Sequence, residues 1–247
     1  MSAAPMTDVI RIAMWSGPRN LSTTMMRSFG ARPEAVCVDE PFYAAWLVAS
    51  GEVHPMQEEI LASQPTDPAI VAKDMLAPLP PGKTLHYQKH MTHHMLDSFP
   101  LDWVGGVRHA FLVRHPGRVI ASYMKKMDSL SLEAIGVPQQ ERLYREITER
   151  TGTPPPVVDS DRILADPPEV LARLCDALGI DWDPAMLGWA PGPKPEDGAW
   201  APHWYDAVWK SSGFGAPPGE TPVHTGRAAE IEKEALASYE RLLENHV

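Results

Sequence analysis

Short apolar runs alternate along the chain with segments that have helical spacing. The run Val9–Trp15 is apolar and ends at a Ser-Gly-Pro turn, so it predicts a buried strand. The next segment, 21–30, has the apolar spacing of a helix and ends at Gly30. Further strands are predicted at Ala35–Val38, Thr84–His90, His109–Pro116 and near Val157 and Val158. Further helices are predicted from about Arg118 to Met127, from Asp166 to Leu178 with Gly179 as cap, and from Arg227 to Asn245.

This order of elements predicts an α/β fold with three layers, in which helices flank a mainly parallel sheet. The length of 247 residues suits one domain over 1–247, in which the part from about 190 forms a lid or pocket segment and a terminal helix. Ligands of such sheets bind at the carboxyl ends of the strands. The polar motifs of this chain should therefore meet at that edge.

Composition limits the classes of partner that the chain can bind. The formal net charge is −10, which argues against a nucleic acid or an anionic membrane as partner. The two cysteines, Cys37 and Cys175, lie in apolar runs and are expected to be reduced, and no leader or membrane span is evident. We therefore expect a cytoplasmic protein, within which a local cluster of arginines can still hold a small anion.

The loop after the first strand has the residues of an anion site. A helix that starts near Ser22 presents free N–H groups, Arg19 adds a forked cation, and Thr23 adds a second hydroxyl. The loop is not a Walker A motif, because Leu21 stands where that motif has lysine. A magnesium-dependent kinase is therefore disfavoured. The alternative interpretation is a purely structural turn between strand and helix.

A second anion motif follows the predicted strand His109–Pro116. Arg114 ends this strand, and Ser122 lies two helical turns further on, so both can face one anion. The alternative is that Arg114 forms a surface ion pair and Ser122 is solvated. Two such motifs in this order, each after a strand, favour the functional interpretation.

The segment Pro-Arg-Asn-Leu-Ser-Thr at 18–23 resembles the 5′-phosphosulfate loop of sulfotransferases, and Arg114, Pro116 and Ser122 resemble their 3′-phosphate motif. Asn20 and Leu21 depart from the usual Ser-Gly, and His115 replaces Asp or Asn. The resemblance implies a P-loop NTPase-like sulfotransferase fold and 3′-phosphoadenosine 5′-phosphosulfate (PAPS) as donor, with 3′-phosphoadenosine 5′-phosphate (PAP) as product and no metal. The cofactor-binding residues that it implies are Ser16, Gly17, Pro18, Arg19, Asn20, Leu21, Ser22, Thr23, Arg114, Ser122 and Lys210.

Weaker matches lie further along the chain. Asp166-Pro167 and the Leu-Gly at 178–179 fit a strand–loop–helix segment of the family, but Ser160 stands where a tyrosine commonly contacts adenine. Lys210, followed by Gly213, is a candidate for the 3′-phosphate. Three tryptophans near it either pack in the core or form a lid or an acceptor pocket. They are Trp200, Trp204 and Trp209.

Two residues compete for the role of general base. Glu40 follows the second strand, at a place that resembles the base of bacterial carbohydrate sulfotransferases, whereas Lys89-His90 resembles a Lys-x-His motif without its middle residue. Glu40 is slightly favoured, although it could merely cap the next helix. Arg19, helped by Lys89, is expected to stabilise the leaving phosphate. The spacing of His90 and His94 also suits zinc, but Met91 replaces the glutamate of that motif.

The sequence thus predicts sulfuryl transfer from PAPS to a hydroxyl of a small molecule or carbohydrate. One alternative is a P-loop kinase for a nucleotide or small molecule. Another is a PAP-binding module without turnover. The sequence does not predict the acceptor or the oligomeric state.

Overall fold

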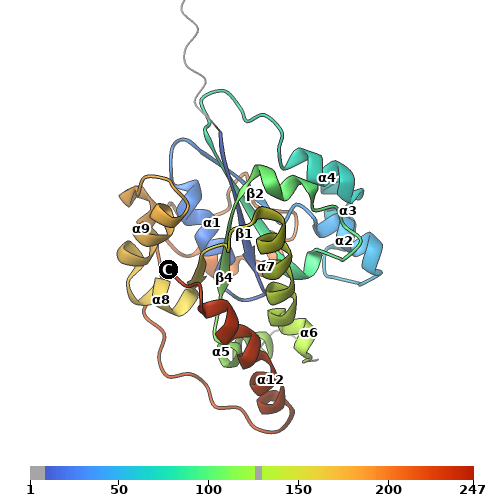
Figure 1. Ribbon diagram of the computed structural model, residues 1–247, viewed down its shortest axis with the longest axis vertical. Coiled ribbons are helices and arrows are strands. Elements are labelled where there is room, and N and C mark those ends of the chain that lie inside the picture. Colours follow the sequence, from blue (N-terminus) through green and yellow to red (C-terminus); the bar gives the residue numbers. More distant parts are fainter. Residues whose placement is uncertain (1–8, 126–129) are drawn as a thin grey trace, which may run out of the picture.

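The computed structural model describes residues 9–125 and 130–247, and their strands form a single parallel sheet. The spatial order is β2-β3-β1-β4-β5, with β1 at the centre (Figure 1). The strands are β1 (Ile10–Ser16), β2 (Ala35–Asp39), β3 (Leu85–Met91), β4 (Arg108–Val113) and β5 (Val157–Asp159). All four pairings are parallel, so the carboxyl ends of the strands meet at one edge.

Side chains alternate between the two faces of each strand, and each face carries its own apolar core. Met14 of β1 belongs to one core, where Phe29 stacks on Tyr87 with ring centroids 4.5 Å apart. Four helices line this face: α1 (Ser22–Gly30), α8 (Ser160–Ala165), α9 (Pro167–Ala177) and the 3-10 helix η3 (Pro184–Leu187). The face is hydrophobic because the inward positions of both strands and helices are apolar.

Trp15, the next residue of β1, belongs to the core on the opposite face, together with Phe42 and Trp103. Figure 1 shows α2, α3 and α4 on the side of the strands opposite to α8 and α9. Among the helices that contribute to this core are α2 (Tyr43–Ser50), α3 (Gln57–Ser63), α4 (Pro68–Asp74), η2 (Asp102–Gly106), α7 (Val137–Thr151) and α10 (Ala201–Trp204). The short helices η1 (Thr92–His94) and α11 (Asp206–Trp209) complete this side.

The terminal helix α12 (Gly226–Leu243) packs across α5 (Pro116–Tyr123), α6 (Leu132–Ile135) and α7. Ile231 of α12 lies in a small apolar cluster with Ile120 of α5 and Ile135 of α6. The chain then returns to the sheet, where His246 forms a bridge with Val157 of β5. The C-terminus is thereby fixed beside the last strand.

The α/β fold with a parallel sheet between helices confirms the prediction from the alternating pattern. The predicted strands agree with the structure within a few residues. The helix predicted from Arg118 to Met127 was placed too late, because α5 begins at Pro116 and ends at Tyr123. Proline suits the first helical turn, where its missing N–H costs nothing. Met127 itself lies outside the described residues.

None of the helices in the described residues combines the length and the apolar character that crossing a membrane requires.

Candidate active site at the carboxyl ends of the strands

The loop that follows β1 turns sharply before α1. Arg19 and Leu21 both have positive φ angles, 64° and 72°, a conformation that non-glycine residues rarely adopt. The Asn20 side chain between them is buried and donates a hydrogen bond to the Leu112 carbonyl, 3.1 Å away. This bond to β4 stabilises the unusual backbone and directs the N-terminus of α1, at Ser22, toward the loop. Asn20, predicted as a ligand contact, thus also anchors the loop.

The loop is packed tightly against the junction of α6 and α7. A Cβ atom on Gly17 would lie 3.0 Å from Oε1 of Gln140, and one on Gly136 would lie 2.8 Å from Cδ of Pro18. Gly136 also has a φ angle of 75°, which favours glycine. The loop and α7 are therefore in contact without space for an added methyl group. The position of the loop depends on two glycines from different parts of the chain.

The two predicted anion motifs lie side by side. Nε of Arg19 donates a hydrogen bond to Oγ of Ser122 at 3.0 Å, and NH1 of Arg114 donates to the Arg19 carbonyl at 2.9 Å. Burial lowers the pKa of both guanidinium groups, and the Arg19 charge lowers the pKa of Arg114 further. The two arginines therefore meet at the same loop, and neighbouring cations attract an anion.

A third arginine and an aspartate complete the surroundings of Arg114. Asp161, at the start of α8, lies 2.6 Å from Nε of Arg118 and 3.9 Å from Nε of Arg114. Within the described residues, Nε of Arg114 is buried and has no hydrogen-bond acceptor. Burial raises the pKa of Asp161, and the charge of Asp159 raises it further. Arg114 thus retains a free donor for a bound anion.

His115 occupies the position that was expected to hold Asp or Asn. It is the N-cap of α5, and its Nδ1 accepts a hydrogen bond from the Gly117 amide at 3.2 Å. Capping of this kind is what Asp and Asn side chains ordinarily provide. The substitution therefore preserves the helix start that positions Ser122.

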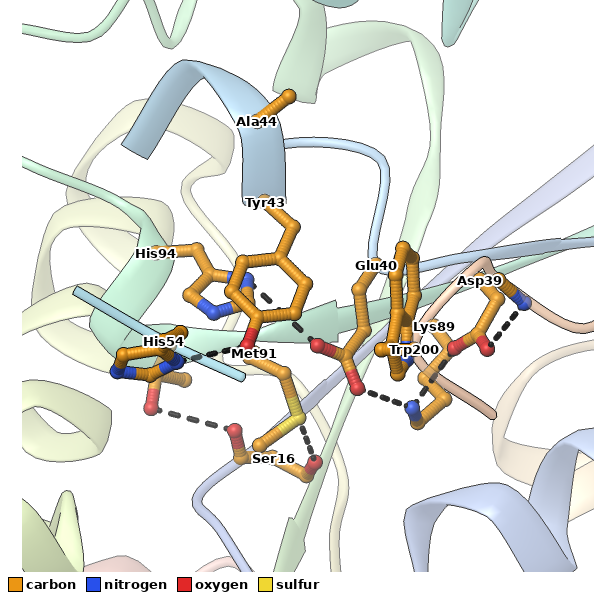
Figure 2. Close-up of polar contacts among 12 residues, drawn as sticks. Ser16, Asp39, Glu40, Tyr43, Ala44, His54, Lys89, Met91, His94 and Trp200 are labelled. Carbon is orange, nitrogen blue, oxygen red and sulfur yellow. Dashed lines mark hydrogen bonds and ion pairs between the residues drawn. The ribbon is translucent and has the colours of Figure 1, made fainter. Parts of the chain in front are cut away.

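A buried group of charges lies at the ends of β2 and β3 (Figure 2). Nζ of Lys89 is 2.5 Å from Oε1 of Glu40 and 2.7 Å from Oδ1 of Asp39. It also donates to the hydroxyl of Tyr205 at 2.8 Å. These three bonds use all three donors of an ammonium group. Lys89, predicted to help at the leaving phosphate, is fully occupied by protein groups.

Glu40 is the first residue after β2, with a φ angle of 42°. Burial raises the pKa of its carboxyl, the Lys89 ammonium lowers it, and Asp39 raises it again, which leaves the pKa at about 7. The other carboxylate oxygen, Oε2, lies 3.8 Å from Nδ1 of His94. A carboxyl with a pKa near neutrality can accept a proton from a substrate and release it afterwards.

His90 is adjacent to Lys89 but points to the opposite face of the sheet, as successive strand residues do. Its ring stacks on Trp15 with centroids 4.5 Å apart, and it lies against Phe42 and Trp103. Burial lowers its pKa well below the usual value. The side chain is 1% exposed, so His90 is part of the aromatic core beneath the site.

Aromatic and imidazole rings form the wall beside Glu40 (Figure 2). The Tyr43 ring stacks on His94 at 4.3 Å, and the Tyr43 hydroxyl lies 2.7 Å from Nδ1 of His54. Burial lowers the pKa of both histidines. The wall is therefore uncharged at neutral pH. In residues 9–125 and 130–247, no three or more potential metal ligands lie together as a group that could hold a metal ion.

The candidates from the C-terminal part have partners of their own. Nζ of Lys210 donates to Oδ2 of Asp206 at 2.8 Å, and the Lys210 side chain is 74% exposed. Trp200 is buried in the core, and its Nε1 donates to the Tyr205 hydroxyl. Trp204 and Trp209 pack partly buried against the same core.

Sequence reasoning missed Asp39 and Tyr205. Asp39 had a visible signal, because it precedes Glu40 at the end of a predicted strand. Tyr205 had none, because 116 residues separate it from Lys89 and nothing in its local pattern indicates this contact.

Comparison with known proteins identifies the family and supports the fold described above. A model of the sulfotransferase domain family matches residues 10–243. Two curated proteins of Arabidopsis thaliana, branched-chain-amino-acid aminotransferase-like proteins 2 and 1, are each 37% identical over 83% of this chain. The chain spans 36% and 37% of their lengths, so the match concerns about a third of each relative.

Solved structures show the same fold at low sequence identity. The sulfotransferase domain of the Synechococcus PCC 7002 olefin synthase has a TM-score of 0.55 and 16% identity, and covers 96% of this chain and 98% of that one. A sulfotransferase from Alicyclobacillus acidocaldarius has a TM-score of 0.54 and 10% identity, with coverage of 96% and 97%. Since the family model spans nearly all of the described residues, this chain belongs to the sulfotransferase family.

Proposed function

We propose that the protein transfers a sulfuryl group from PAPS to a hydroxyl group of a small molecule or carbohydrate. The observation that carries this proposal is the hydrogen bonding of Arg19 to Ser122 and of Arg114 to the Arg19 carbonyl, which joins the two anion motifs. PAPS carries its 5′-phosphosulfate and its 3′-phosphate on one ribose. A single ligand of this shape therefore needs two neighbouring cationic sites.

The residues present fit this donor. The free, buried Nε of Arg114 has no acceptor among the described residues, and a phosphate oxygen would supply one. The N-terminus of α1, with Ser22 and Thr23, suits the 5′ end because helix amides bind anions. The lysine of a Walker A loop is absent, which disfavours the kinase alternative.

Glu40 serves as the general base in this proposal. Since β3 separates β2 from β1, the end of β2 lies two strand spacings, about 10 Å, from the phosphate loop. An acceptor hydroxyl between them can lose its proton to Glu40 while its oxygen faces the donor. His90 is less suited, because it lies on the other face of the sheet within an aromatic core.

Arg19 stabilises the leaving group. The donor supplies a sulfuryl group whose bond to the 5′-phosphate breaks as the acceptor oxygen attacks the sulfur. Negative charge then develops on the phosphate next to the loop, where the Arg19 guanidinium and the α1 amides can donate hydrogen bonds. The acceptor proton ends on Glu40, and PAP and the sulfate ester leave. Lys89 acts on Glu40 rather than on the donor, because all of its donors are taken.

The proposed acceptor is uncharged near its reacting hydroxyl. The wall beside Glu40 consists of Tyr43, His54 and His94, which are neutral at physiological pH. Neutral polar groups of this kind suit the hydroxyls of an uncharged acceptor. We also propose a cytoplasmic location, which the two free cysteines support.

Binding of the product nucleotide tests the proposal. We expect PAP to raise the melting temperature more than ATP with magnesium does. Arg114→Ala and Ser122→Ala should each weaken PAP binding by about 1.5–3 kcal/mol in calorimetry, because each removes a contact to a charged group. Arg173→Ala, on the exposed face of α9, is the matched control and should bind PAP like the wild type.

Transfer itself is measured with 35S-labelled PAPS and a panel of sugars, phenols and alcohols. Label appearing in an ester, and lost with Arg19→Ala, is the expected result. Unchanged PAP affinity in both the Arg114 and the Ser122 variants would exclude the proposed 3′-phosphate site. PAP binding without transfer to any acceptor would instead favour a module without turnover.

A further inference from the structure

Two carboxylates share one buried ammonium group beside the proposed base. Lys89 is 1% exposed and lies between Asp39, which is 3% exposed, and Glu40. Burial lowers the pKa of Lys89, but the two carboxylates outweigh this effect and raise it well above its usual value. The trio therefore carries two negative charges and one positive charge when both carboxylates are ionised. One negative charge remains unbalanced inside the protein.

We propose that Asp39 is a positioning residue. Because it binds the same Lys89 ammonium as Glu40, Lys89 stabilises the ionised Glu40 carboxylate less, and Glu40 remains a good proton acceptor. This inference rests on the proposed role of Glu40 as the base. A lysine paired with Glu40 alone would neutralise the carboxylate and make it a poor proton acceptor. With Asp39 present, the Lys89 charge acts on two carboxylates instead of one. The Asp39 carboxylate also places a second negative charge near Glu40.

The hydrogen bonds of Asp39 fix this arrangement. Its Oδ1 accepts from Lys89, while Oδ2 accepts from the Tyr205 hydroxyl at 2.7 Å and from the Gly198 amide at 3.2 Å. The Tyr205 hydroxyl in turn accepts from Nε1 of Trp200 at 3.1 Å. Asp39 is thus held by donors from the C-terminal part of the chain and cannot turn away from Lys89.

Other groups near Glu40 add no charge that competes with this effect. On α2, the pKa of Tyr43 is raised, chiefly by burial, so its hydroxyl stays neutral. On η1, burial lowers the pKa of His94, and neighbouring histidines and Lys89 lower it further. From the C-terminal segment, Tyr205 has a raised pKa and is neutral as well. The charges that face Glu40 are therefore Lys89 and Asp39.

The test is a 13C NMR titration of the Glu40 carboxyl carbon in the wild type and in Asp39→Asn. The asparagine keeps the shape but removes the negative charge, so the Glu40 midpoint should fall by about one pH unit or more. The acid limb of the pH profile of kcat/KM should move in the same direction. An unchanged Glu40 midpoint in Asp39→Asn would overturn the inference.

Asp197→Asn is the matched control. The Asp197 side chain is 5% exposed and paired with a cation, Arg27 at 2.7 Å, but it does not contact Lys89. Its loss should lower stability without moving the Glu40 midpoint. A shift of equal size in this variant would show that any loss of a buried ion pair has the effect, and would count against Asp39.

A measurement on the wild type covers the case in which Asp39→Asn does not fold. Because the two carboxylates share one ammonium, the carboxyl carbon of Asp39 should show an inflection at the midpoint of Glu40. A flat Asp39 signal through that pH would refute the shared cation. These titrations need no turnover, so they can succeed or fail independently of whether Glu40→Gln abolishes transfer.

Discussion

Glu40 and His90 lie close to the same lysine along two neighbouring strands, yet only one of them faces the site. The backbone amide of Glu40 donates to the Lys89 carbonyl at 2.9 Å, which places the glutamate just beyond the paired part of β2. His90 follows Lys89 within β3, so its side chain enters the opposite core. The period of two in a strand therefore separates the two adjacent candidates into the proposed base, Glu40, and a core residue, His90.

Glu40→Gln should lower kcat by about 10²- to 10⁴-fold while PAP affinity stays near that of the wild type. In the wild type, the pKa of Glu40 of about 7 means that the ionised, proton-accepting form is populated above pH 7. The value of kcat/KM should thus fall as the pH drops below about 7. Rates measured from pH 5 to 9 check this expectation.

Glu58→Gln serves as the control, because Glu58 is exposed in the first turn of α3 and lies outside the proposed site. It should retain the wild-type rate and pH profile. Full activity of Glu40→Gln, with an unchanged acid limb, would remove Glu40 from the mechanism.

At the scale of elements, the sequence predicted the order of strands and helices. Each element shows a regular spacing of apolar residues and ends at residues that terminate a strand or helix. The sequence also indicated the two motifs that the structure brings side by side, since each follows a strand directly. Contacts between residues that are far apart in the sequence could not be predicted from it. Gly136 contacts Pro18, and Gln140 bonds to the Leu112 carbonyl, yet nothing local to α7 shows that this helix supports the loop after β1.

Gly136→Ala should therefore affect the loop as well as α7. The added methyl group meets Cδ of Pro18 at 2.8 Å, and the φ angle of 75° adds a strain of about 1 kcal/mol. We expect a lower melting temperature and weaker PAP binding, measured by calorimetry. Gly152→Ala separates the two effects, since Gly152 has a φ angle of 70° but no atom near its Cβ position.

The Gly152→Ala variant should then be less stable because of backbone strain alone, and it should bind PAP like the wild type. Equal PAP affinity in both alanine variants would mean that the contact between Gly136 and Pro18 does not position the loop.

At the scale of the whole molecule, the part from about residue 190 was expected to be a lid or pocket segment with a terminal helix. In the structure, this segment has many side-chain contacts with the rest of the molecule. Arg27 of α1 pairs with Asp197, Trp200 lies in the main core, and the Tyr239 hydroxyl donates to Asp159 at 2.6 Å. The last residues also bond to Val157 of β5. The segment is bound to both faces and to the edge of the sheet.

Such interlocking predicts that residues 1–247 unfold as one domain. A calorimetric scan should show a single transition whose van't Hoff and calorimetric enthalpies agree. Trp200→Ala removes a fully buried indole and should lower the stability of the entire molecule by about 3–5 kcal/mol, seen as a shift of that one transition. Val223→Ala, at a side chain that is 93% exposed, should leave the transition in place. Two transitions, of which Trp200→Ala moves only one, would show instead that the C-terminal part is a separate unit and that Asp39 is held by a segment able to detach.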